Sequence, residues 1–280
     1  MRLWMVACLL LGSLAACTGK PGREAHRLAT GRMTDAGLLR LETAPADAPF
    51  DNAELARNFE WIALRSEVAL DRPGTDDNAR EGALRRWSGP IRWRLIGAGA
   101  TLRDRAEVAA VFERIGTASG LDIAEVAEGE TANYIILVTT PEERDEVSAL
   151  LTRVSRPVAR VFDQWRRSPL IVCAGVFGGP RPDIPDISVA FVFLGDELTG
   201  RLRRACIHEE IAQAMGLPND HPDVRPSIFN DDQEFALLTV HDEWLLRLLY
   251  DPRLEPGMEA ADVRPILPAI LAERRPEPQG

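Results

Sequence analysis

Apolar residues recur every three or four positions in four stretches of the chain, and this spacing places them on one face of a helix. The pattern predicts helices near residues 52–67, 102–120, 141–165 and 199–215. In the first of these, Leu55, Phe59 and Ile62 share one face. The second ends at Gly120, and glycine is the residue that most often terminates a helix.

Other stretches alternate between apolar and polar residues, or are short and continuously apolar, as strands are. They predict strands within residues 89–99, 121–127, 132–140, 169–177 and 187–195. In the first, Ile91, Trp93 and Leu95 alternate with arginines. Helices and strands interleave along the chain, with no internal repeat and no second-domain boundary. We therefore expect an α+β fold, close to α/β, in which one mixed sheet packs on the helix at 199–215.

The N-terminus has the organisation of a secretory signal. One arginine precedes an apolar run that is shorter than the roughly 20 residues that a membrane span needs. The run ends in Leu14-Ala15-Ala16-Cys17, which resembles the lipobox of bacterial lipoproteins, in which the cysteine is acylated after cleavage. Because Thr18 rather than Asp follows the cysteine, the resemblance implies a lipid anchor at the periplasmic face of the outer membrane. The alternative is an ordinary cleaved signal with an incidental cysteine.

Four segments follow from these patterns. Residues 1–17 form the signal peptide, and residues 18–50, which are short on periodic apolar positions, are predicted to be a flexible tether. Residues 51–272 make a single domain, and residues 273–280 a disordered tail.

Composition excludes some partners. The formal net charge is −10, which argues against nucleic acid and against an electrostatic grip on anionic lipid. Of the four cysteines, Cys8 leaves with the signal and Cys17 takes the lipid, so Cys173 and Cys206 remain as an even pair in an oxidising compartment. We expect them to form a disulfide with Cα atoms about 5.5 Å apart.

The stretch EEIAQAMGLPND, residues 209–220, carries the candidate chemistry. The zinc-binding helix of metzincin peptidases is written H-E-x-x-H-x-x-G-x-x-H. This chain keeps the glutamate at Glu210 and the glycine at Gly216, and it has Glu209, Gln213 and Asn219 at the three histidine positions. Residues 209 and 213 lie one turn apart on the same face of the expected helix.

The resemblance continues beyond this helix. Metzincins place a methionine-containing turn beneath the metal, and the stretch SIFND has Phe229 at the methionine position. A further helix is expected after Thr239, which forms a capping box with Asp242. Together with the lipobox, this run over residues 206–258 resembles the bacterial lipoprotein family called domain of unknown function 2927. It implies a metzincin-like or matrixin-like zincin fold, and it implies no established activity.

The residue types at the three ligand positions do not suit zinc, which prefers imidazole and thiolate. Two amides and one carboxylate suit calcium better, and the acidic residues nearby favour the same cation. These residues are Glu209, Glu210, Asp220, Asp223, Asp231 and Asp232. A purely structural interpretation explains the same residues as a hydrogen-bonded pair and turn caps. Histidines 208, 221 and 241 are expected to form hydrogen bonds or face solvent, rather than to rebuild a zinc site.

Two functions stay open at this point. The first is a non-catalytic binding or structural module of the cell envelope that contacts the membrane through Cys17 and binds an envelope protein or peptide, with no cofactor. The second is a metal-dependent hydrolase, most simply a peptidase, in which an oxygen-liganded metal works with Glu210 as the general base.

Overall fold

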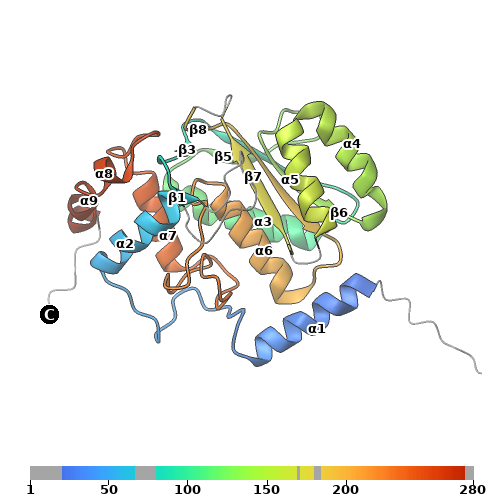
Figure 1. Cartoon of the computed structure of the whole chain (residues 1–280), viewed down its shortest axis with the longest axis horizontal. Coiled ribbons are helices and arrows are strands. Elements are labelled where there is room, and N and C mark those ends of the chain that lie inside the picture. The colour runs from blue at the N-terminus through green and yellow to red at the C-terminus, as the bar shows by residue number, and fades with distance from the viewer. Residues whose placement is uncertain (1–20, 67–79, 169–170, 180–183, 275–280) are drawn as a thin grey trace, which may run out of the picture.

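A computed structural model describes residues 21–66, 80–168, 171–179 and 184–274. Its centre is a five-stranded sheet with helices on both faces (Figure 1). The sheet contains β4 (Ile91–Ile96), β5 (Ile123–Glu125), β6 (Tyr134–Thr139), β7 (Ala174–Gly178) and β9 (Val189–Gly195). All five predicted strand stretches are therefore confirmed, and the mixed α/β class with them.

The strands lie in the order β5-β4-β6-β9-β7. The first four are parallel, and β7 runs antiparallel to β9 at one edge of the sheet. Strand β6 is buried on both faces because successive side chains point to opposite sides: Ile136 and Val138 enter the larger core, and Leu137 enters a smaller one. A central strand between two helical layers requires this continuous apolar pattern.

The larger core lies between the sheet and one set of helices. They are α2 (Asn52–Ala63), α3 (Leu102–Ser119), α6 (Gly200–Gln213) and α7 (Val240–Leu249). Capping boxes begin α3 at Thr101 and α7 at Thr239, as the sequence predicts for α7. Gly120 ends α3 with φ of 75°, which confirms the predicted stop. Within this core, α6 contacts α3 and the sheet strands β7 and β9.

The opposite face of the sheet is covered by a helical hairpin. Its parts are a 3₁₀ turn at Pro141–Glu143, α4 (Arg144–Val154) and α5 (Arg156–Arg167). The single helix predicted over residues 141–165 is therefore wrong in continuity, because Ser155 adopts an extended conformation between α4 and α5. Pro157 is the physical reason: it has no N–H to donate, and it is tolerated only in the first turn of a helix.

The segment predicted to be a tether also differs from expectation. It contains α1 (Pro21–Asp35), and beyond this helix Leu39 is completely buried. Arg40 forms an isolated bridge with Phe235. The helix has few large apolar residues, and it is held by tertiary contacts, among them Arg23 with Asp196. Only tertiary structure could therefore reveal it.

Shorter elements complete the fold. Two-residue strands pair β1 (Arg65–Ser66) with β2 (Arg80–Glu81), and β3 (Arg86–Trp87) with β8 (Asp186–Ile187). Helices α8 (Ala260–Val263) and α9 (Leu267–Arg274) follow α7. Helix α9 extends into the predicted tail, where Glu273 pairs with Arg253; residues 275–280 lie outside the described part. Among the described residues, no helix is both long and apolar enough to cross a bilayer.

Candidate functional site

The candidate site is built on the C-terminal half of α6. The last carbonyl groups of a helix have no partner within the helix, and three aromatic side chains supply partners here. The Tyr134 hydroxyl donates to the Ile211 carbonyl at 2.9 Å, and the Trp87 indole donates to the Ala214 carbonyl at 2.9 Å. The Tyr250 hydroxyl donates to the Met215 carbonyl at 2.8 Å. The end of α6 is therefore fixed by the sheet, by α7 and by the segment before β4.

Gly216 reverses the chain after this helix end. Its φ of 112° lies in the region that favours glycine, as the motif predicts, although the helix itself ends earlier, at Gln213. A methyl group at Gly216 would overlap the carbonyl oxygen of Arg85. The glycine thus permits both the turn and the close approach of a neighbouring segment.

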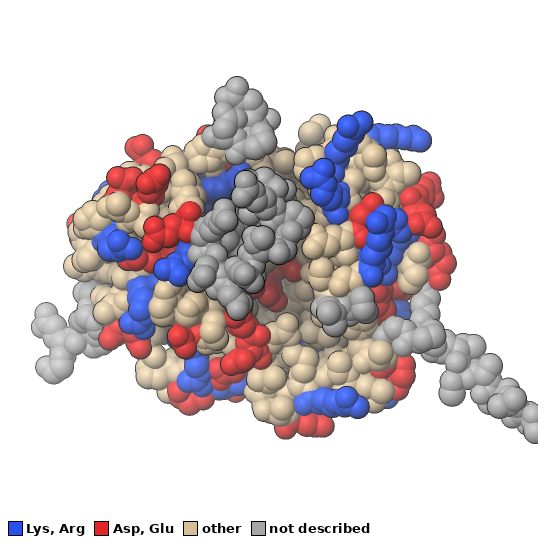
Figure 2. Space-filling model, in the orientation of Figure 1, with Lys and Arg blue, Asp and Glu red and all other residues tan. Residues whose placement is uncertain are grey.

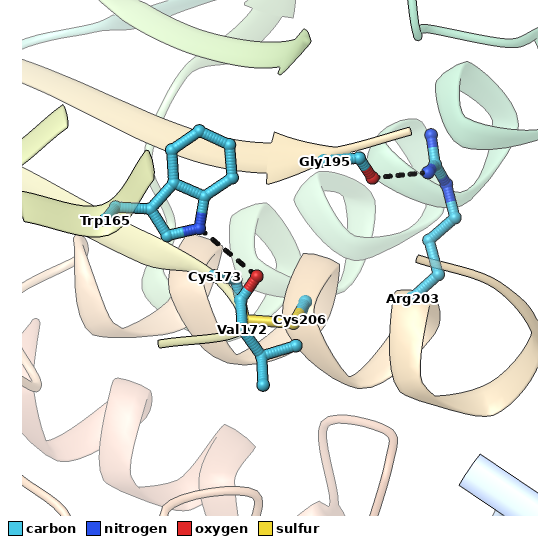
Figure 3. Close-up of a disulfide and its surroundings, with 6 residues drawn as sticks. All are labelled: Trp165, Val172, Cys173, Gly195, Arg203 and Cys206. Atoms are coloured by element: carbon cyan, nitrogen blue, oxygen red, sulfur yellow. Dashed lines mark hydrogen bonds between the residues drawn. A yellow bond between two sulfur atoms is a disulfide. The ribbon is translucent and has the colours of Figure 1, made fainter. Parts of the chain in front are cut away.

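A disulfide joins α6 to the edge strand. Cys173, directly before β7, is bonded to Cys206 of α6 with a Cα–Cα distance of 5.9 Å, which confirms the predicted pairing (Figure 3). The neighbouring carbonyl of Val172 accepts a hydrogen bond from the Trp165 indole of α5 at 3.2 Å. The edge strand is therefore fastened on both sides, to α6 and to α5.

Cys173 and two alternate residues of β7, Gly175 and Phe177, each contact a different partner. After the disulfide at Cys173, Gly175 lies against Glu210: a methyl group at Gly175 would be 2.8 Å from Glu210 Oε2. Two residues further on, the ring of Phe177 lies 5.7 Å beneath the guanidinium of Arg85. We call this line of contacts the α6–β7 seam.

The Glu210 carboxyl, the candidate general base, lies buried in this seam. Glu210 as a whole residue is only 7 % exposed. Burial is the larger cause that raises the pKa of Glu210 to about 8, and the nearby charge of Asp220 is the second. A carboxyl with this pKa is mostly protonated at neutral pH, so it can donate a hydrogen bond but is a poor base there.

Gln213, at the second ligand position, is engaged by the loop that follows the glycine turn. Its amide nitrogen donates to both carboxylate oxygens of Asp220, at 2.9 and 3.1 Å. The amide thus presents its N–H₂ group toward Asp220, and its oxygen is the only atom of this side chain that has lone pairs for a cation.

Asn219, at the third ligand position, is bound to α2. It is 1 % exposed, and its amide nitrogen donates to the Trp61 carbonyl at 2.9 Å and to the Asp220 carbonyl at 3.0 Å. Next to it, His221 stacks on the Trp61 ring with centroids 4.0 Å apart. Two consecutive contacts therefore hold the loop against Trp61.

The SIFND turn is a rigid, buried structure. Asp242 at the start of α7 accepts hydrogen bonds from the Ser227 hydroxyl at 2.5 Å and from the Ile228 amide at 3.2 Å. Phe229 is fully buried, and its carbonyl accepts a hydrogen bond from the His221 amide at 3.0 Å. The turn thus supports the 219–221 loop from below.

Two further histidines have structural partners. His208 Nδ1 accepts a hydrogen bond from the Leu238 amide, so its Nε2 carries the proton and donates to Glu107 at 2.8 Å. Burial lowers the pKa of His208, more strongly than Glu107 raises it. His241 is fully buried, with Nε2 3.0 Å from the side-chain nitrogen of Asn58.

The donor set does not fit a zinc ion. Two of the three ligand positions are amides whose nitrogens donate elsewhere, and His208 points toward α3. Across the described ranges, no three His, Cys, Asp or Glu side chains gather closely enough to hold a metal. The expected gathering of six acidic residues around calcium is therefore not what the structure shows.

Arg85 is a residue of the seam that the sequence pattern did not single out. Its Nε is buried, and among the described residues it has no hydrogen-bond partner. Burial lowers the pKa of its guanidinium. An arginine inside a polar loop carries no distinctive sequence signal, and only the approach of this segment to Gly216 and Phe177 places it here.

Comparison with known proteins places the chain in a family. The family described as "Protein of unknown function (DUF2927)" matches residues 52–269. The chain belongs to this family. The DUF2927 domain thus begins at the first residue of α2 and includes the whole α6–β7 seam. No curated protein matches the chain. Cys17, the predicted lipidation site, lies outside the described residues.

Proposed function

We propose that this protein is a lipoprotein of the outer membrane, anchored through Cys17 on the periplasmic face, whose DUF2927 domain is a non-catalytic binding module. The domain resembles a zincin in having a sheet packed on a helix that carries a glutamate and ends in a glycine turn. At two of its three zinc-ligand positions, Gln213 and Asn219, an amide nitrogen donates hydrogen bonds within the protein.

The observation that carries the proposal is the hydrogen bonding of Gln213 to Asp220. In a zinc peptidase this position must present a lone pair to the metal, but here it presents N–H donors to a carboxylate. Asn219 is likewise directed to the Trp61 carbonyl. The protonated state of Glu210 at neutral pH supports the same conclusion.

The ligand that suits the seam is an extended segment of polypeptide. In the part of the sheet that the structure describes, β7 pairs only with β9, so its other edge presents backbone groups to a partner strand. The guanidinium of Arg85 lies over the ring of Phe177 in this strand, so a positive charge accompanies the edge.

One observation favours the second candidate, a hydrolase with Glu210 in acid–base catalysis. Active sites often raise the pKa of a glutamate by burial and by a like charge, and both causes act on Glu210. Such an enzyme would need a nucleophile activated by means other than the three zinc-ligand positions.

Metal analysis of the purified, unlipidated protein separates the two functions. We expect no stoichiometric zinc, and we expect Glu210→Gln to leave the function in cells unchanged. The triple variant Glu209→His, Gln213→His and Asn219→His should bind zinc measurably by calorimetry, because three imidazoles replace the amides and the carboxylate. Zinc at one per chain in the native protein, or peptide hydrolysis that Glu210→Gln abolishes, would establish the hydrolase instead.

A further inference from the structure

Helix α5 presents a basic face that contrasts with the net charge of −10 on the whole chain. Arg156, Arg160 and Arg167 are exposed and occupy positions i, i+4 and i+11. At 3.6 residues per turn these positions fall within about 40° of arc. The opposite side of α5 is buried on the sheet by Phe162 and Trp165. The helix is therefore amphipathic, with arginines as its solvent-facing stripe.

The charges of this stripe are largely uncompensated. Within the described chain, Arg156 and Arg160 form no ion pair, and neither does Arg153 at the tip of the α4–α5 hairpin. The one acidic residue of α5, Asp163, is already paired with Arg166 at 2.5 Å. Its second pair, with Arg167 at 3.3 Å, involves an arginine side chain that is 68 % exposed and therefore contributes little.

A shallow hollow accompanies the stripe. Its volume is about 420 Å³, and its lining contains the three stripe arginines together with Thr152, Gln164, Ala159 and the carboxylate of Asp163, which is paired with Arg166. The space-filling view shows basic side chains over α5, at the upper right of the molecule (Figure 2). Guanidinium, hydroxyl and amide groups around one hollow are the donors that phosphate oxygens accept from.

The start of α1 lies close to this hairpin. Arg23 donates to the Asp196 carbonyl at 2.9 Å, and the next residue, Glu197, accepts from Arg144 at the start of α4 at 2.7 Å. Arg166, at the end of α5, pairs with Asp145 of α4 at 2.7 Å. The described chain therefore begins at the connection between β9 and α6, on the side of the molecule where α4 and α5 lie (Figure 1).

The predicted anchor cannot lie far away. Cys17 precedes Arg23 by six residues, which span at most about 20 Å when fully extended. Helix α5, with 12 residues, is about 18 Å long. A membrane that holds a lipid on Cys17 is thus within reach of the arginine stripe.

We propose that the arginine stripe of α5 is a second membrane contact, which binds the phosphate groups of anionic phospholipids and orients the anchored domain. This inference rests on the proposed lipid anchor at Cys17. The short connection selects a lipid surface over a soluble acidic partner, because the anchor keeps the stripe close to phosphate groups at high local concentration. The net charge of the whole chain predicts no such contact. Charges farther from the lipid surface than the Debye length of about 8 Å are screened, however, so the local charge of the stripe decides the contact.

Vesicle binding of the unlipidated protein tests the inference directly. The mature chain carrying Cys17→Ser should bind vesicles of phosphatidylglycerol and phosphatidylcholine, and should not bind vesicles of phosphatidylcholine alone. Replacing Arg156, Arg160 and Arg167 by Gln should weaken this binding about 100-fold, or about fivefold for each arginine near an anionic surface. Added salt should weaken the binding of the unsubstituted protein.

A matched control removes three positive charges elsewhere. Arg103→Gln, Arg105→Gln and Arg264→Gln change the net charge equally at exposed positions on α3 and after α8. This control should bind the anionic vesicles within about threefold of the unsubstituted protein, since α3 and α8 pack in the larger core and α5 packs in the smaller one on the opposite face of the sheet. Equal losses in the two triple variants, or no binding to anionic vesicles by the unsubstituted chain, would overturn the inference.

The anchor is tested separately in cells. If cells incorporate labelled palmitate into the protein and Cys17→Ser abolishes this incorporation, the proposed anchor is supported. This holds whatever the vesicle experiment shows. Without palmitate incorporation the anchor fails, while the vesicle result still decides whether α5 binds anionic lipid. The arginines can also be chemically modified in the presence of either inorganic phosphate or vesicles. If inorganic phosphate protects them as well as vesicles do, the hollow is assigned to a soluble phosphate instead, and the inference is overturned.

Discussion

The buried carboxyl of Glu210 makes the free energy of unfolding depend on pH. Its pKa is raised from 4.5 to about 8, so between these pH values the folded state holds a proton that the unfolded state has lost. The contribution of Glu210 to the free energy of unfolding is therefore greatest below about pH 4.5. It declines as the pH rises to about 8, by at most about 1.4 kcal/mol per pH unit.

Glu210→Gln should remove this dependence. At pH 8 we expect the variant to have a free energy of unfolding greater than that of the unsubstituted protein by several kcal/mol in order of magnitude, seen as a higher urea midpoint. At pH 5 the two should differ little. Glu113→Gln, at an exposed position of α3, serves as the control and should follow the unsubstituted protein at both values. Parallel stabilities of Glu210→Gln and the unsubstituted protein would show that Glu210 is ionised in the fold.

The residues of the site were foreseen from the sequence only as positions in a motif. The motif located Glu210, Gln213, Asn219 and Gly216 at the end of one helix, and the structure does place them there. The hydrogen-bond partners could not be foreseen, because Trp61 and Asp220 reach these side chains through a loop and a distant helix. Arg85 was missed for the same reason.

At the scale of elements, the end of α6 depends on its glycine. Gly216→Ala should destabilise the protein by about 3 kcal/mol or more, because the new methyl group meets the Arg85 carbonyl in a backbone conformation that alanine disfavours. Gly129→Ala is the matched control: it has φ of 91° but no heavy atom within 4 Å of the added methyl group.

Chemical denaturation measures both variants. The control should lose only the conformational contribution, about 1 to 2 kcal/mol. If Gly216→Ala costs no more than Gly129→Ala, the segment at Arg85 moves freely away from α6, and the seam is less rigid than its contacts indicate.

Elements with strong local patterns were predicted well, and those without were not. Helices α2 and α3 carry apolar stripes, and the strands carry alternating or continuous apolar runs. The break between α4 and α5 was missed although Pro157 signals it, because the apolar period continues on both sides of the break. Helix α1 has few large apolar residues, and its contacts with α6 and with Asp196 hold it in place.

At the scale of the whole molecule, the disulfide ties the edge strand to the central helix across 33 residues of sequence. Removing it with Cys173→Ala and Cys206→Ala together should lower the free energy of unfolding by about 3 to 4 kcal/mol, since a closed loop of this length restricts the unfolded chain. The shift should appear as a lower urea midpoint in non-reducing buffer.

The reduced protein provides the control for that comparison. In a strong reductant, the unsubstituted chain should lose most of its advantage over the double variant, apart from the small cavity that alanine leaves. An advantage that persists in full after reduction would assign the effect to packing of the two side chains and not to the cross-link.

Local periodicity and residue chemistry are sufficient to predict the α/β class, the positions of the five sheet strands, the disulfide pair and the helix that carries Glu210. The tertiary structure alone decided the strand order, the partners of Gln213 and Asn219, the burial of Glu210 against Gly175, and the placement of the α5 arginines on the side of the molecule where α1 begins. Most of these features join residues that are far apart in the chain, although Gln213 and Asp220 are separated by only seven positions. Such contacts depend on how whole elements pack, which no short stretch of sequence specifies.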